Sequence, residues 1–250
     1  MNPSLFFDFY SVFFILAATF LLSLSQGFKK SAVDLIAGVI VPIGVVGCLI
    51  GTIAILSNMS DPDGLIPAIF VSALPFGYAL IISGLVTKHD HWAKEVSNDL
   101  RYKSVSTLAL YCLILWVMNL AAGVDAFIHL SAIVFVVLAL ALLVLFNLVM
   151  GQPWFDGIQS KLIGLGLLGL LLGLLAAFVN SKDPRSIGTA IAFGYLSLMY
   201  CLLIFISCRI WLPADLSRQT SSHYPLWLGL GVPFMLGIVG SFWIIIMSFA

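Results

Sequence analysis

Apolar stretches long enough to cross a lipid bilayer fill most of this 250-residue chain. In a helix, about 20 apolar residues cross a hydrocarbon core of about 30 Å. Eight such stretches lie near residues 8–27, 33–57, 64–87, 104–122, 130–150, 161–179, 187–210 and 226–248. Because lipid offers the backbone no hydrogen bonds, stretches of this length are viable as helices. The sequence therefore predicts an all-α, polytopic membrane protein with about eight transmembrane helices.

Composition agrees with this class and argues against several functions. The chain is 62% hydrophobic and 9% charged, which is typical of a protein whose surface faces lipid. Its formal net charge is zero, which argues against a nucleic-acid partner. The four cysteines all lie inside apolar stretches, where they are expected to pack as small hydrophobic residues rather than form disulfides. The sequence contains no recognisable catalytic constellation, so we expect no enzymatic activity, no cofactor and no metal.

Part of the chain repeats at an offset of 122 residues. Residues 42–83 align with residues 164–205 without a gap, and about fourteen of some forty positions are identical. The matches include three glycines of one helix, the Asn-x-x-Asp-Pro turn that follows it, and a tyrosine of the next helix. They pair Gly44, Gly47, Gly51, Asn58, Asp61, Pro62 and Tyr78 with Gly166, Gly169, Gly173, Asn180, Asp183, Pro184 and Tyr200. An internal repeat of this kind constrains the fold.

The same offset maps the first four apolar stretches onto the last four. The predicted unit is therefore a four-helix membrane repeat that is used twice, over residues 1–122 and 123–250. Four helices return the chain to its starting side of the membrane. The two copies are thus expected to share one orientation, as parallel repeats.

Lys and Arg are divided unevenly between alternate polar segments. One set of alternate segments holds nine of them, and the other holds only Lys182 and Arg185. Because an excess of Lys and Arg marks the cytoplasmic side, the first set is predicted to be cytoplasmic. Both chain termini and both Asp-Pro turns are then predicted to lie on the outer side.

Labelling with a membrane-impermeant thiol reagent checks this orientation. We expect Ser60→Cys and Ser181→Cys to be labelled in intact cells, because both positions lie in predicted outer turns. Ser97→Cys and Ser160→Cys should stay unlabelled until the membrane is opened. The unaltered chain gives the background from its native cysteines. Labelling of Ser97→Cys in intact cells would reverse the predicted orientation.

A row of small residues follows one face of the helix predicted at 33–57. Gly44, Gly47, Gly51 and Ala54 are spaced by three and four residues, so they share one side of a helix. Small residues let the backbones of two membrane helices approach closely. This face is expected either to pack against another helix or to form a close-packed wall beside a conduction path. Leu49 lies off this face and is expected to contact lipid.

The Asn-x-x-Asp-Pro turn also has two interpretations. Asp61 and Asp183 each precede a proline, which is favoured at the first position of a helix, and each can cap that helix. The alternative is an ion site at the outer mouth of a pore. In the helix that follows, Pro75 is expected to free a backbone carbonyl. The hydroxyls of Thr52, Ser72 and Tyr78 are possible polar linings, although lone hydroxyls in membrane helices usually bond their own backbone.

The segment LSNMSDPDGLIPAIFVSAL (56–74), with the glycine-rich helix before it, resembles the MotA/TolQ/ExbB proton-channel family. It looks most like the third and fourth helices of flagellar stator A-subunits. The resemblance implies a location in the bacterial inner membrane and a ring of helices around a partner's transmembrane helices, with ions passing at the contact. Cys48 stands where the family has a threonine of the ion path, and Pro75 and Phe76 stand where it has a threonine pair.

The resemblance also implies which residues and partners to consider. Asp8 and Asp34 lie near helix ends, so the carboxylate of an ion path is expected from a single-span partner protein with an intramembrane Asp. A homo-oligomer is also compatible with the resemblance. The alternatives are a non-conducting scaffold or assembly factor, and a small-molecule transporter. The candidate residues for an ion path or partner packing are Gly44, Gly47, Gly51, Thr52, Asn58, Asp61, Pro62, Pro67, Ser72, Pro75 and Tyr78, with Gly166, Gly169, Gly173, Asn180, Asp183, Pro184 and Tyr200 as their equivalents in the second copy.

Overall fold

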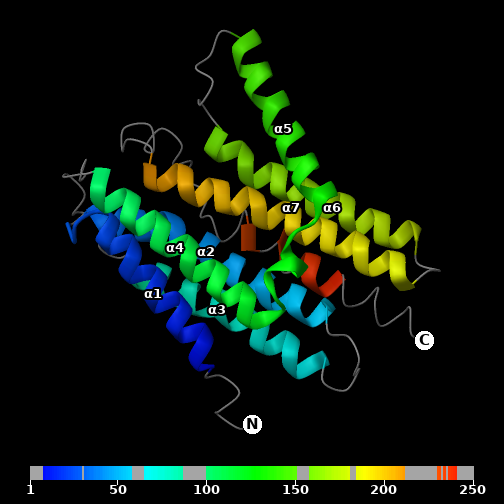
Figure 1. Cartoon of the computed structure of the whole chain (residues 1–250), viewed down its shortest axis with the longest axis horizontal. Helices are drawn as coiled ribbons and strands as arrows, with labels where there is room; N and C mark the ends of the chain where they lie inside the picture. Colours follow the sequence, from blue (N-terminus) through cyan, green and yellow to red (C-terminus); the bar gives the residue numbers. More distant parts are fainter. Residues whose placement is uncertain are drawn as a thin grey trace. The chain divides into compact units, whose positions relative to one another are not determined.

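The computed structural model describes residues 8–29, 31–57, 65–86, 100–150, 158–180 and 184–211, and short pieces at 230–231, 233–234 and 236–240. Helices account for nearly all of these residues, and no strand occurs among them. The helices are α1 (Phe9–Ser25), α2 (Ser31–Ser57), α3 (Leu65–Val86), α4 (Leu100–Ala121), the 3-10 turn η3 (Val124–Phe127), α5 (Leu130–Val149), α6 (Ile158–Val179) and α7 (Pro184–Trp211), which are labelled in Figure 1.

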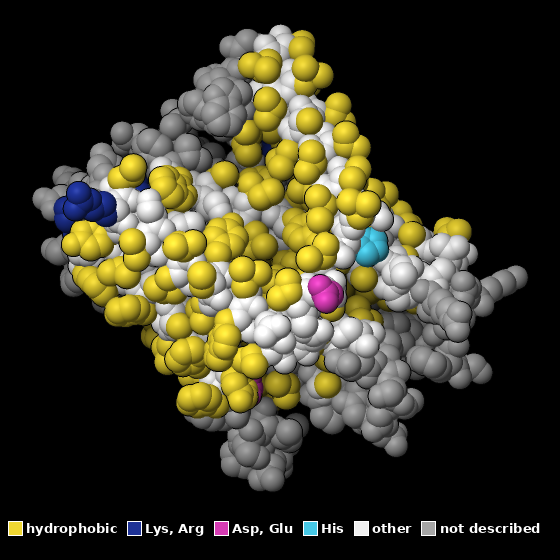
Figure 2. Space-filling model, in the orientation of Figure 1, with side chains coloured by type: hydrophobic (Ala, Val, Ile, Leu, Met, Phe, Trp, Pro, Cys, Tyr) yellow, Lys and Arg dark blue, Asp and Glu magenta, His cyan; other side chains and the backbone are white. Residues whose placement is uncertain are grey.

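The predicted all-α class is confirmed for the described residues. Within the described residues, six helical segments are long and apolar enough to cross a membrane, and α1 is a shorter apolar helix of 17 residues. Their outward faces are apolar as well. Figure 2 shows hydrophobic side chains covering most of the visible surface of α4 and α5, where Leu108, Trp116 and Leu142 are among the exposed residues. The predicted eighth span at 226–248 lies largely outside the described residues.

The chain divides into two compact units. The first comprises residues 1–127 with 206–218, and the second comprises residues 128–205 with 219–250. In the first unit α2 is the central helix, and α1, α3 and α4 all pack against it (Figure 1). Most side chains of α2 are therefore buried on every side. The prediction that Leu49 contacts lipid was wrong, because this side chain is 0% exposed.

Helix α1 is fixed at both ends by its own sequence. Asp8 is the N-cap, and its carboxylate accepts a hydrogen bond from the backbone N–H of Ser11 at 2.8 Å. After the last turn the chain reverses at Gly27, whose φ of 62° is easily reached only without a side chain. Helix α4 lies against α1, where Ser106 donates a hydrogen bond to the carbonyl of Leu21. The cap thus holds the first turn of α1, and the bond from Ser106 holds its second half against α4.

The second unit contains α5, α6 and most of α7. Helix α6 packs against α7 through its glycines, and Phe135 of α5 contacts α6 near Gly169. Near the other end of α5, Lys161 donates a hydrogen bond to the buried side-chain carbonyl of Asn147 at 3.1 Å. The N-cap of α5 is His129, whose backbone N–H donates to the hydroxyl of Tyr200 at 3.3 Å.

Helix ends in the two units correspond at the repeat offset. Helix α2 ends at Ser57 and α6 ends at Val179, which is 122 residues later. Helices α1 and α3 shifted by 122 residues fall within one to three residues of the ends of α5 and α7. The two compact units do not coincide with the predicted repeats 1–122 and 123–250, because residues 206–218 belong to the first unit. The division of the sequence into these two repeats stays a prediction.

Candidate functional site: a cavity in the first unit

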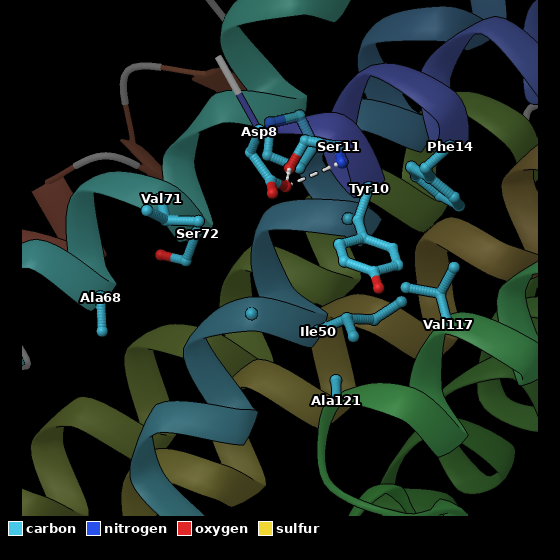
Figure 3. Close-up of a pocket in the computed structure, with 13 residues that line it drawn as sticks. Asp8, Tyr10, Ser11, Phe14, Ile50, Ala68, Val71, Ser72, Val117 and Ala121 are labelled. Atoms are coloured by element: carbon cyan, nitrogen blue, oxygen red, sulfur yellow. Dashed lines mark hydrogen bonds between the residues drawn. The ribbon is translucent and has the colours of Figure 1, made fainter. Parts of the chain in front are cut away.

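A cavity of about 380 Å³ lies in the first unit where α1, α2, α3 and α4 approach one another. Its size falls within the range of small-molecule sites. The lining is mostly apolar, with a few polar groups from α1 and α3. The lining residues are Asp8, Tyr10, Ser11, Phe14, Gly47, Ile50, Gly51, Ala68, Val71, Ser72, Pro75, Val117 and Ala121 (Figure 3).

Close packing of α2 against α3 forms the floor of the cavity. A Cβ atom built on Gly51 would lie 2.6 Å from the Cβ of Ser72, and one built on Gly47 would lie 2.8 Å from the Cβ of Pro75. These distances are shorter than van der Waals contact, so only glycine fits at either position. Gly47 lies ten residues before the end of α2, which is about 15 Å along the helix at 1.5 Å per residue. The cavity therefore reaches well into the membrane-spanning part of this pair.

The polar end of the cavity is formed by Asp8. One carboxylate oxygen, Oδ2, accepts hydrogen bonds from both the backbone N–H and the hydroxyl of Ser11, at 2.8 and 2.6 Å. Figure 3 shows both bonds reaching the same oxygen atom. The other oxygen, Oδ1, makes no hydrogen bond to the described residues. The negative charge of Asp8 is favourable at the N-terminus of α1, because the aligned peptide dipoles leave that end of the helix positive.

Helix α3 contributes the hydroxyl of Ser72, and its proline removes a helical donor from one lining residue. Proline has no N–H, so Pro75 cannot donate the helical hydrogen bond to the carbonyl of Val71, one turn earlier. The helix continues through Pro75, and both residues line the cavity. The hydroxyl of Ser72 donates to the carbonyl of Ile69 at 2.7 Å, which leaves its oxygen as an acceptor. The carbonyl that Pro75 was predicted to free therefore belongs to Val71, which is one of the lining residues.

Four of the predicted candidates come together in this cavity: Gly47, Gly51, Ser72 and Pro75. Three others in the first unit lie elsewhere. A Cβ on Gly44 would lie 2.4 Å from the Cβ of Ala79, so Gly44 packs directly on α3 and does not line the cavity. Thr52 is buried and donates its hydroxyl to the carbonyl of Cys48 at 2.7 Å. Tyr78 is half-buried and is not part of the lining.

Several candidates cannot be placed. Asn58, Asp61, Pro62 and Asp183 lie outside the described residues. Pro67 and Pro184 belong to α3 and to the first turn of α7, but their side chains are outside the described set as well.

The glycines of the second unit repeat the contacts of the first. A Cβ built on Gly44 would meet Phe76 and Ala79 of α3. A Cβ built on Gly166 would meet Leu198 and Cys201 of α7, which are the residues 122 positions later. The same holds for two further pairs. Gly51 meets Ser72 and Gly173 meets Gly194, while Gly47 meets Pro75 and Gly169 meets Ser197. Of the other equivalents, Asn180 donates its side-chain amide to the carbonyl of Ala176, and Tyr200 contacts His129.

Residues of α1 were missed as site residues by reasoning from sequence. Asp8 was seen only as a residue near a helix end, and Tyr10, Ser11 and Phe14 were not singled out. A signal did exist, because an Asp directly before an apolar run is typical of a helix N-cap. That pattern places a carboxylate at the end of a helix, but it does not say which other helices surround it.

Comparisons with protein-family models, with curated proteins and with solved structures found no match for this chain. Among the described residues, no group of three or more His, Cys, Asp or Glu side chains lies close enough to hold a metal ion. The described lining of the cavity therefore offers one carboxylate, a few other oxygen acceptors and an apolar wall for binding a ligand or an ion.

Proposed function

We propose that this membrane protein works with a second membrane protein in an ion-coupled process, in the manner of the MotA/TolQ/ExbB family that the α2–α3 pair resembles. The observation that carries the proposal is the grouping of Gly47, Gly51, Ser72 and Pro75 around one cavity. These residues were predicted from the sequence as the ion path or the partner contact. A path for a cation needs polar groups beside it, and the cavity has such groups at the end of α1.

The partner helix is proposed to dock on the outward face of α3. Gly77 lies on this face, and a Cβ built on it meets no atom of the described chain within 4 Å. Ile81 lies one helical turn after Gly77 and is exposed. Membrane helices associate through small residues of this kind, because close backbone approach increases van der Waals contact. The glycines of α2 do not offer such a face, since α3 and Phe14 already cover them.

The proposal includes two parallel repeats in the bacterial inner membrane, with both termini on the outer side. The corresponding helix ends and glycine contacts of the two units support the repeat. The uneven distribution of Lys and Arg supports the orientation. The missing carboxylate of the ion path is assigned to the partner, because no Asp or Glu lies at the centre of a described helix.

Purification from native membranes followed by reconstitution tests the proposal. We expect the tagged chain to retain a single-span protein with an intramembrane Asp, identified by mass spectrometry. Gly77→Leu should abolish this retention, because the larger side chain separates the two helices. Gly188→Leu is the matched control, since Gly188 also faces open space but lies on α7. Equal retention by both variants would contradict the proposed face on α3.

Measurement of ion flux distinguishes an ion-conducting complex from a non-conducting scaffold. In liposomes with an imposed pH or Na⁺ gradient, we expect flux from the complex, no flux from the chain alone, and loss of flux when the partner's Asp is changed to Asn. Saturable flux from the chain alone would contradict the need for a partner. Absence of flux from both preparations would favour a non-conducting scaffold.

A further inference from the structure

We propose that the cavity of the first unit is a binding site for a protonated amine with a small apolar body. The site does not depend on the proposed partner, because every group that forms it belongs to α1, α2, α3 and α4 of this chain. The inference rests on three observations: the chemistry of the polar groups in the cavity, the absence of Lys, Arg and His among its described lining residues, and the contrast with the second unit.

Apart from the hydroxyl of Tyr10, which can also donate, the polar groups of the cavity are hydrogen-bond acceptors. The proton of Ser11 is already donated to Asp8, and the proton of Ser72 is already donated to the carbonyl of Ile69. The oxygen Oδ1 of Asp8 and the carbonyl of Val71, which Pro75 leaves without a helical donor, are acceptors only. Such a set matches a ligand that brings its own N–H donors. A hydrogen bond between an ammonium group and a carboxylate is among the strongest in proteins.

Charge and shape restrict the ligand further. No Lys, Arg or His is among the described lining residues, so the half-buried carboxylate of Asp8 has no positive partner there. A divalent metal ion such as Ca²⁺ takes six or more oxygen ligands, and this cavity provides a single carboxylate. The remaining wall is apolar, with the ring of Phe14 and the side chains of Ile50 and Val117 (Figure 3). An ammonium group at Asp8 with its apolar body against these side chains satisfies both parts of the cavity, and aromatic faces add cation–π attraction.

Aromatic side chains occupy the corresponding positions in the second unit. The residue 122 positions after Val71 is Phe193, whose ring packs edge-to-face on Phe135 with centroids 5.6 Å apart. The ring of His129 also lies 6.5 Å from the ring of Phe193. His129 is the N-cap of α5 as Asp8 is of α1, and it lies one residue before the 122-residue equivalent of Asp8. The second unit thus has aromatic rings and a histidine where the first has Val71 and a carboxylate. We therefore assign the amine site to the first unit alone.

Equilibrium binding of 2-phenylethylamine to the purified chain in detergent tests this inference. This probe is protonated at neutral pH, and 2-phenylethanol is its uncharged counterpart of nearly the same shape. We expect the amine to bind at least about tenfold more tightly than the alcohol, because only the amine forms a charged hydrogen bond to Asp8. In Asp8→Asn this preference should disappear. Asparagine is an equally good N-cap, so α1 should keep its structure.

A cavity-filling variant separates binding at this site from partition into the micelle. Val71→Phe copies the residue of the second unit and should weaken binding of both probes, whereas Phe193→Val should leave the affinity for the amine unchanged. A thermal unfolding midpoint for each variant shows that it is folded. Equal affinity for amine and alcohol, or amine binding that neither Asp8→Asn nor Val71→Phe reduces, would overturn the inference.

Discussion

Replacing Gly44 by leucine is expected to prevent stable folding of the first unit. A Cβ at this position would lie 2.4 Å from the Cβ of Ala79, 3.0 Å from the carbonyl oxygen of Pro75 and 3.1 Å from the Cα of Phe76. Two of these three atoms belong to the backbone of α3, so side-chain rotation cannot relieve the clash. Overpacking of a close contact typically costs about 1–3 kcal/mol and occasionally more. We expect the upper end of this range or beyond, because two helices must separate.

Gly77→Leu is the matched control for this variant. Gly77 belongs to the helix that Gly44 contacts, but a Cβ there meets no described atom within 4 Å. Leucine is also a better helix former than glycine by up to about 1 kcal/mol. Size-exclusion profiles and thermal unfolding midpoints in detergent should show a monodisperse, stable Gly77→Leu and an aggregated or strongly destabilised Gly44→Leu. Similar midpoints for the two variants would contradict the close contact between α2 and α3.

Truncation of Phe14 is expected to have the second-largest effect. Phe14 is 2% exposed and its ring fills the space that Gly47 leaves open, where a Cβ would lie 2.9 Å from the ring. In water-soluble cores such Phe→Ala changes cost about 3–5 kcal/mol. We expect the lower end of that range here. In lipid the unfolded reference also keeps the ring away from water, so mainly packing is lost.

Phe13→Ala provides the comparison, because Phe13 is the neighbouring residue on the other face of α1. It is 44% exposed and contacts Trp116 at 6.1 Å between ring centroids. We expect a much smaller decrease in the thermal unfolding midpoint for Phe13→Ala than for Phe14→Ala. A larger effect at Phe13 would show that α1 presents a different face to α2.

Sequence alone determined the fold class of this protein, for a reason specific to membranes. Lipid cannot satisfy backbone hydrogen bonds, so a run of about 20 apolar residues has essentially one stable structure. The positions of α2, α3 and α6 follow from such runs. The glycine spacing of α2 also identified a helix face, because residues three and four apart share one side of a helix whatever surrounds it.

Only the tertiary structure decided what covers each face. In lipid, the apolar side chains of a helix look alike whether they meet another helix or the bilayer, so hydropathy does not distinguish them. Leu49 was therefore assigned to lipid, although α2 is surrounded by three other helices and Leu49 is buried. For the same reason Gly77, where a Cβ meets no described atom, could not be told from the covered glycines of α2.

The cavity required both kinds of information. The proline and glycines on its walls were visible as special residues, since each has a backbone property that other residues lack. Asp8 was visible as a charge near a helix end. That these residues surround one space depends on how α1 packs between α3 and α4. This is a long-range arrangement, and no local pattern in the sequence encodes it.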